Sequence, residues 1–238
     1  MMPLLPLSAN TEYHNLIGNT ALTTAAQEGH IATLKSLIEA GADLEHKDTW
    51  GWTALIWAAH MGHNSTVAEL TAAGANTEHQ STDANTALTI AAARGHTGTV
   101  MALIAAGANM EHEDSWGYTA LLCAVKKSQT GTVAALLEAG ADLEHEDSYG
   151  CTALLLAARW SEPDSLRVLL AAGADIQHWN RVGNTAMSFA KMYDHHDIAT
   201  ILEESGAQDC GWPPHSIIKN IELQTAVFQS ATTRCDQM

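Results

Sequence analysis

The chain has 238 residues, with 11 Lys and Arg against 27 Asp and Glu and a formal net charge of −16 at pH 7. This length suits one or two compact domains or one repeat array, and so acidic a chain lacks the clustered cations that binding to nucleic acid or an anionic membrane requires. No apolar run approaches the roughly 18 residues that span a bilayer, and the N-terminal segment, broken by Pro3 and Pro6, is a poor signal peptide.

One spacing recurs through most of the chain. Six threonines, each followed by Ala and then by Leu (Met in the last copy), stand 33 residues apart: Thr20, Thr53, Thr86, Thr119, Thr152 and Thr185. Two residues before each threonine stands a glycine, replaced once by Ala84, and a Gly-Ala pair recurs late in every copy. A fixed period of roughly 20–50 residues indicates a solenoid of stacked repeats.

In chain order, we expect residues 1–17 to be a partial repeat or N-terminal cap, because 9–12 match 75–78 in register. Six repeats follow, with boundaries at 18–50, 51–83, 84–116, 117–149, 150–182 and 183–207. Residues 208–238 no longer repeat, but Ile217, Ile221 and Phe228 can share one helical face. This predicts a helix that covers the open end of the stack; the alternatives are a disordered tail and a docking segment for another subunit.

The second repeat shows how one copy is expected to fold. Thr53 is placed to cap a short helix, and Gly62 supplies the tight turn that ends it. A second helix carries Val67 on its buried side and ends before Gly74. Residues 75–83 are polar and return the chain to the next repeat. Because such a repeat cannot bury its apolar face alone, it must stack on its neighbours.

These features resemble the ankyrin repeat, over residues 18–207. The resemblance implies an all-α solenoid of stacked helix-turn-helix repeats with hairpin or β-turn fingers. The family's T-P-L-H is T-A-L or T-A-M here, followed by Thr, Ile, Leu or Ser, so a rigid helix start and a hydrogen-bonding side chain are missing. The Gly-His turn between the helices is replaced in the last three repeats, which predicts less regular turns at Ser128-Gln129, Ser161-Glu162 and Asp194-His195.

The 13 histidines invite a search for a metal site. The most regular set recurs every 33 residues: His46, His79, His112, His145 and His178. Equivalent residues of stacked helical repeats are roughly 8–10 Å apart, whereas zinc ligands lie within about 2.0–2.2 Å of the ion. We therefore interpret these residues as structural, together with the turn residues His30, His63 and His96. The adjacent His195-His196-Asp197 lacks the i, i+4 spacing of a zinc helix.

Catalytic motifs are absent from the sequence. It contains no G-x-S-x-G, P-loop or G-x-G-x-x-G. We therefore predict no catalytic residue, no metal and no cofactor, and a protein that is not an enzyme. The cysteines form no CxxC pair: Cys123, Cys151, Cys210 and Cys235. Scattered thiols are typical of a reducing compartment, so we expect an intracellular, cytoplasmic protein, with the nucleus as the alternative.

The remaining candidate function is binding. In ankyrin proteins, ligands mostly contact the concave face, made by the fingers and the exposed ends of the first helices. On these positions the resemblance implies the following candidate protein-binding residues: Trp50, Trp52, Met61, Arg94, Trp116, Tyr118, Lys126, Lys127, Tyr149, Arg159 and Trp160.

Two patterns stand out within this set. In a chain with 5% aromatic residues, five occupy finger positions, where exposed rings would suit a binding hot spot. The alternative is that each ring packs on the next finger and stiffens the array; Trp57, inside a first helix, is expected to pack against the adjacent repeat. Four cations from Arg94 to Arg159 take equivalent helix-end positions beside acidic fingers. They suit a peptide with both an acidic and a basic segment, or else the charges neutralise each other.

The sequence thus predicts a monomeric, non-catalytic module that binds another protein or a peptide, and neither nucleic acid nor membrane. The runner-up is a substrate-recognition or adaptor subunit of a multiprotein enzyme, such as a ubiquitin ligase, docked through residues 208–238. An architectural spacer without a ligand is the third possibility.

Overall fold

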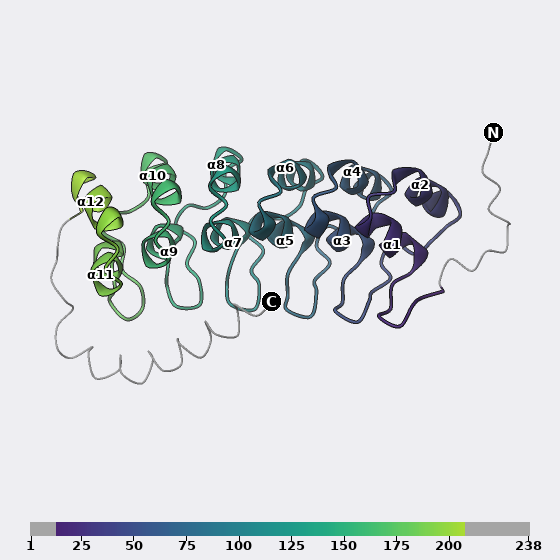
Figure 1. The fold of residues 1–238 in the computed structure, drawn as a ribbon, viewed down its shortest axis with the longest axis horizontal. Coiled ribbons are helices and arrows are strands. Elements are labelled where there is room, and N and C mark those ends of the chain that lie inside the picture. The colour runs from purple at the N-terminus through teal and green to yellow at the C-terminus, as the bar shows by residue number, and fades with distance from the viewer. Residues whose placement is uncertain (1–12, 208–238) are drawn as a thin grey trace. The chain divides into compact units, whose positions relative to one another are not determined.

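The structure, a computed structural model, describes residues 13–207 (Figure 1). These residues form two compact units that divide between Ser148 and Tyr149. The first unit contains α1 (Ala21–Gln27), α2 (Ile31–Glu39), α3 (Ala54–Met61), α4 (Asn64–Ala72), α5 (Ala87–Arg94), α6 (Thr97–Ala105), α7 (Ala120–Lys126) and α8 (Thr130–Glu138). The second contains α9 (Ala153–Trp160), α10 (Pro163–Ala171), α11 (Ala186–Met192) and α12 (His196–Glu204). The expected tail helix and most of the N-terminal cap lie outside the described residues.

Each unit is a two-layer stack of helix pairs. In the first unit α1, α3, α5 and α7 pack side by side in an inner row, and α2, α4, α6 and α8 in an outer row. The second unit repeats this arrangement with α9 beside α11 and α10 beside α12. The long connections project as fingers from the inner row, away from the outer helices (Figure 1). No strand occurs between residues 13 and 207, and no helix there is long and apolar enough to cross a membrane.

Small side chains explain the close packing of the inner row. Within α3, Leu55, Ala58 and Ala59 are fully buried, and nearly all of α7 and α9 is equally enclosed. The outer helices bury one side only, as Val67 and Leu70 do in α4. Alanine and leucine favour helix, and alanine lets two helix axes approach closely. The predicted all-α architecture of stacked helix-turn-helix repeats is confirmed within each unit.

The inner helices begin in two different ways. Thr20, Thr86 and Thr185 accept a hydrogen bond from the backbone N–H three residues on, where the side chain is Thr or Ser. In the other three repeats that third residue is Ile or Leu, and the buried threonine hydroxyl has no partner: Thr53, Thr119 and Thr152. The expected side-chain cap at Thr53 is therefore wrong, although its backbone keeps the extended N-cap conformation, φ −88° and ψ 172°.

The turns between paired helices are as regular in the late repeats as in the early ones. Ser128, Ser161 and Asp194 adopt φ of 61°, 58° and 58°, the left-handed conformation that Gly62 has at 74°. The following amide donates to the same helix carbonyl, at 3.0 Å after Gly62 and 2.9 Å after Ser128. The predicted irregularity is wrong because these residues accept backbone strain and keep the hydrogen bonds.

One polar side chain shapes each finger. Asp48 Oδ1 accepts the backbone N–H of Trp50 at 2.8 Å and of Trp52 at 2.9 Å. Asp114 repeats both bonds in its own finger, and Ser81 and Asn180 make the equivalent pair. Such side-chain bonds to the backbone two and four residues on fix a turn. The fingers are thus turns, as the resemblance implied.

The regularly spaced histidines join neighbouring repeats. The Nε2 atom of His46 lies 2.8 Å from the carbonyl of Gly18, and His79, His112 and His178 make the equivalent contact one repeat apart. His63 and His96 do the same for the helix-connecting turns. Each of these six rings contacts a carbonyl of the preceding repeat, as the structural interpretation expects. His145 differs, because its Nε2 atom lies 3.6 Å from Oε1 of Glu113.

Candidate protein-binding surface

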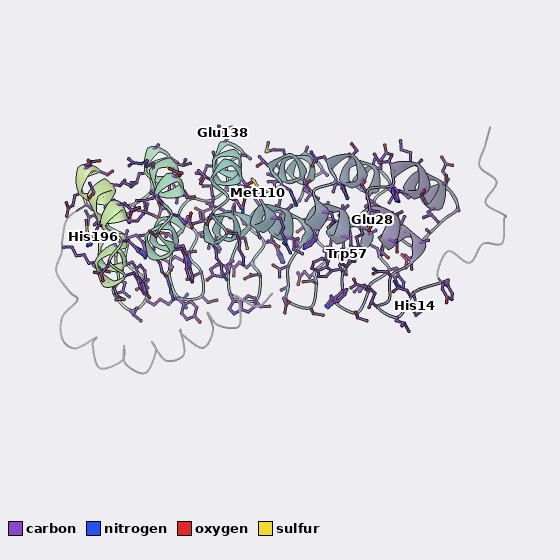
Figure 2. All side chains as sticks on the ribbon, in the orientation of Figure 1. His14, Glu28, Trp57, Met110, Glu138 and His196 are labelled. Carbon is purple, nitrogen blue, oxygen red and sulfur yellow. The ribbon has the colours of Figure 1, made fainter. Side chains whose placement is uncertain are left out.

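Four rings meet on the finger side of α3. Trp50 and Trp52 from the finger, and Trp57 and His60 from the helix, form what we call the aromatic cluster. Ring centroids lie 4.7 Å apart for Trp52 and Trp57, 5.0 Å for Trp52 and His60, and 6.0 Å for Trp50 and Trp57. Figure 2 shows Trp57 on the side of α3 that faces the fingers. Edge-on pairs at these separations are the favoured aromatic geometry.

Trp57 anchors this cluster to the finger. Its Nε1–H donates to Asp48 Oδ2 at 2.9 Å, while Asp48 Oδ1 holds the turn. By the repeat boundaries given above, Trp50 and Asp48 belong to the preceding repeat, whereas Trp52 and His60 belong to the repeat of Trp57, so the indole contacts both repeats. One carboxylate therefore positions both the finger backbone and the ring on which the other finger rings rest.

The cluster combines packed and open surface. Trp52, Trp57 and His60 are half-buried, whereas Trp50 is 46% exposed and Met61, the next residue after His60, is 43% exposed. The Trp52 ring packs on Trp57 and His60 of α3. Trp52 and Trp57 contact each other, and Trp50 and Met61 are the exposed large apolar side chains of this region.

The next repeat contributes a cation to this surface. Arg94, at the end of α5, donates through Nη2 to Nε2 of His60. Burial, followed by the Arg94 and His96 charges, lowers the pKa of His60 to about 4. At neutral pH the imidazole is therefore uncharged and can accept from the guanidinium. The bond holds one nitrogen of an otherwise exposed arginine beside the aromatic cluster.

Two further cations lie at the equivalent end of α7. Lys126 Nζ sits 4.9 Å from the centroid of the Tyr118 ring, within cation–π range, and Lys127 is exposed. Burial raises the pKa of the Asp114 carboxyl in the same finger as Tyr118. Its hydrogen bonds to two finger amides and the Lys126 charge act in the opposite direction but are outweighed. Because α5 packs beside α7, Arg94, Lys126 and Lys127 form what we call the basic patch.

The second unit holds the other predicted residues. The Arg159 guanidinium lies 5.2 Å from the Trp160 ring centroid and 5.8 Å from that of Phe189. Trp160 is half-buried with its Nε1 unpaired, and Tyr149 is half-buried in a finger whose carbonyl accepts from the Arg181 N–H at 3.1 Å. Trp116, in the first unit, is half-buried as well. The four predicted cations are thus shared between the units, with Arg159 in the second.

The sequence interpretation overlooked the residues that shape these fingers. Asn, Asp or Ser recurs every 33 residues, three positions before each finger glycine or its replacement: Asn15, Asp48, Ser81, Asp114, Asp147 and Asn180. All three residue types are typical of turns that bond their own backbone, so residue type and spacing together carried the signal. Among residues 13–207, no group of three or more His, Cys, Asp and Glu is arranged to hold a metal ion.

The comparisons with known proteins assign the family. A sequence profile described as ankyrin repeats (3 copies) matches residues 2–81, 62–147 and 88–180. The chain belongs to the ankyrin-repeat family. It is similar to the crystal structure of the ankyrin repeat domain of Bcl-3, described as a unique member of the IkappaB protein family. Identity is 26% and the TM-score 0.75, over 81% of this chain and 88% of that one. No curated protein matches the sequence. Ankyrin repeats are in general protein–protein interaction modules.

Proposed function

We propose that this chain is a non-catalytic module that binds a protein or peptide on its concave face, the surface of fingers and inner-helix ends. One observation carries the proposal: a chain poor in aromatic residues exposes Trp50, a member of the aromatic cluster, and Met61, which follows the cluster residue His60. Exposed aromatic side chains surrounded by packed neighbours are characteristic of interaction hot spots.

The surface is already ordered before a ligand arrives. The bond from Trp57 to Asp48 and the Asp48 bonds to the finger backbone hold the support of Trp50. Backbone hydrogen bonds join neighbouring fingers, such as Thr82 N–H to the Trp50 carbonyl at 3.2 Å. Little conformational freedom remains to be lost on binding, which favours affinity. The candidate residues of the second unit occupy finger and inner-helix positions of that unit.

We place this binding function inside the cell. Cys123 and Cys151 are buried thiols, as expected in a reducing compartment. The adaptor function proposed from the sequence depends on residues 208–238, which lie outside the described residues, and no observation in the structure favours it over simple binding.

The test is affinity capture with the full chain and a Trp50→Ala/Met61→Ala variant. Trp179→Ala is the matched control, because Trp179 is 71% exposed but occupies none of the candidate positions. Thermal melts of all three baits must agree before capture is compared. A partner retained by wild type and the control, and lost by the double variant, supports the proposal. Equal capture by all three refutes the concave face as the binding surface.

A further inference from the structure

We propose that the first unit selects an extended, acidic peptide whose apolar anchor side chain rests on Trp50 and Met61 and whose carboxylates reach the basic patch. The inference rests on the proposed function, since it takes the same face as the binding surface and names the class of its ligand.

The cations of the first unit are concentrated on this face. Its described residues contain five Lys and Arg, and three of them form the basic patch: Lys35, Lys47, Arg94, Lys126 and Lys127. Lys35 belongs to the outer row, where Nζ pairs with Glu69 at 2.7 Å. The three cations of the patch contact an imidazole, a phenol ring or solvent, and within the described residues none makes an ion pair with a carboxylate. The patch can therefore take carboxylates from a ligand.

Several carboxylates of the first unit accept hydrogen bonds from its own backbone. Glu45, Glu78 and Glu111 each accept a backbone N–H from the following repeat, at 2.8, 3.0 and 2.9 Å. Asp114 accepts two finger amides, and burial raises the pKa of its carboxyl. These groups serve the fold and leave the basic patch available, despite the net negative charge of the whole chain.

The spacing of the repeats sets the spacing of the ligand. Neighbouring helices pack about 8–10 Å apart, and an extended chain advances roughly 3.3–3.6 Å per residue, so one repeat corresponds to about three peptide residues. An anchor on Trp50 and Met61, one repeat before Arg94 when counted from Met61, puts a carboxylate about three residues along beside Arg94. A second carboxylate, about six residues from the anchor, reaches Lys126 and Lys127.

Arg94 is the specificity-determining member of the patch. Its bond to His60 fixes the guanidinium next to the anchor position and leaves its other N–H groups to bind a carboxylate, the partner that a guanidinium binds in two-pronged fashion. Lys127 is exposed and adds attraction that salt screens. Charge pairs of this kind act most on association rate and partner choice.

The experiment is selection of a random twelve-residue peptide library, displayed on phage, against the purified full chain. The same library is selected against Trp50→Ala/Met61→Ala and against Arg94→Glu/Lys127→Glu. The matched control is Lys35→Glu/Arg167→Glu, the same change of charge on the outer helices α2 and α10. Sequencing of the enriched pools gives residue preferences relative to the apolar anchor, in either chain direction, and the strongest peptide is resynthesised for fluorescence polarisation.

We expect Asp and Glu to be enriched over Lys and Arg about three and six positions from an apolar residue. The resynthesised peptide should bind Arg94→Glu/Lys127→Glu at least tenfold more weakly and the control chain within twofold of wild type. Peptides that need Trp50 and Met61 but are neutral or basic at those positions, or that ignore the Arg94 and Lys127 changes, overturn this inference and leave the proposed function standing. Peptides that bind the Trp50→Ala/Met61→Ala chain equally well, or the absence of any peptide dependent on those residues, count against both.

Discussion

Thr86 and Thr53 precede the first helices of adjacent repeats, and replacing each by valine should change the free energy of unfolding differently. Thr86→Val should lower it, whereas Thr53→Val should not. Thr53 and Thr86 have nearly the same extended backbone, ψ 172° and 170°, and both are buried. The Thr86 hydroxyl accepts the Thr89 N–H at 3.4 Å, whereas the Thr53 hydroxyl is buried without a partner. Valine has nearly the shape of threonine and replaces the hydroxyl by a methyl group in both variants, so the difference between the two substitutions reports the hydrogen bond.

The magnitudes follow from that difference. Loss of a side-chain cap costs about 0.5–2 kcal/mol, and the length of the Thr86 bond places Thr86→Val near the lower end, about 0.5–1 kcal/mol. A buried hydroxyl without a partner costs about 1–3 kcal/mol, so Thr53→Val should leave stability unchanged or raise it by about 1 kcal/mol. The two variants should therefore differ by about 0.5–2 kcal/mol in free energy of unfolding.

Urea unfolding followed by circular dichroism at the helix band measures this difference through the midpoint, provided that the slope of the transition stays constant. In a chain of this size, about 1 kcal/mol corresponds to a shift of roughly 2–4 °C in Tm. Equal destabilisation by both substitutions would show that the Thr53 hydroxyl has a partner. It would then be wrong that the threonine caps its helix only where Thr or Ser stands three residues further on.

Three further substitutions or titrations test the geometry. Ala84→Gly should raise the free energy of unfolding by roughly 0.5–1 kcal/mol, because left-handed strain at φ 60°, about 1–2 kcal/mol, exceeds the added unfolded-state entropy of glycine, about 0.4–1 kcal/mol. A lower urea midpoint at constant slope would refute the strain. Asp114→Asn keeps a side-chain oxygen that can accept the two finger amides, as Oδ1 of Asn180 does in its own finger, and should leave stability at pH 7 unchanged. Asp114→Ala removes that acceptor and should cost about 1–2 kcal/mol. Burial raises the folded-state pKa of Asp114, so folding disfavours the ionised carboxylate. The wild-type chain should therefore lose stability as pH rises through the folded-state pKa. The Asn variant does not titrate there and should lack this pH dependence of stability. The lowered pKa of His60, about 4 against 6.5, should make the wild-type chain lose stability as pH falls from 6.5 to 4. An NMR titration of His60 should find its midpoint near 4 in wild type and at a higher pH in Arg94→Ala. An unchanged midpoint in that variant would rule out Arg94 as a cause of the lowered pKa.

Features that depend on local chain geometry could be predicted from the sequence. Gly62 and Gly74 end their helices where expected, with φ of 74° and 89°, because the requirement for a left-handed residue is set by the turn itself. The same reasoning failed for Ser128. It treated glycine as necessary, whereas a strained residue holds the turn when neighbouring repeats fix its two ends.

The candidate surface depends instead on contacts between repeats and on side-chain rotamers. The bond from Arg94 to His60 spans 34 residues, and the bond from Asn76 N–H to Glu45 spans 31. In an array with a 33-residue period, such separations become neighbours, so these pairs could have been proposed once the period was known. Rotamers are different: Trp50 and Trp52 are two residues apart and bond the same carboxylate through their amides. Only Trp50 is exposed, because the Trp52 ring packs on Trp57 and His60. The period therefore predicts which residues can meet, while packing of the side chains decides which of them a ligand can reach.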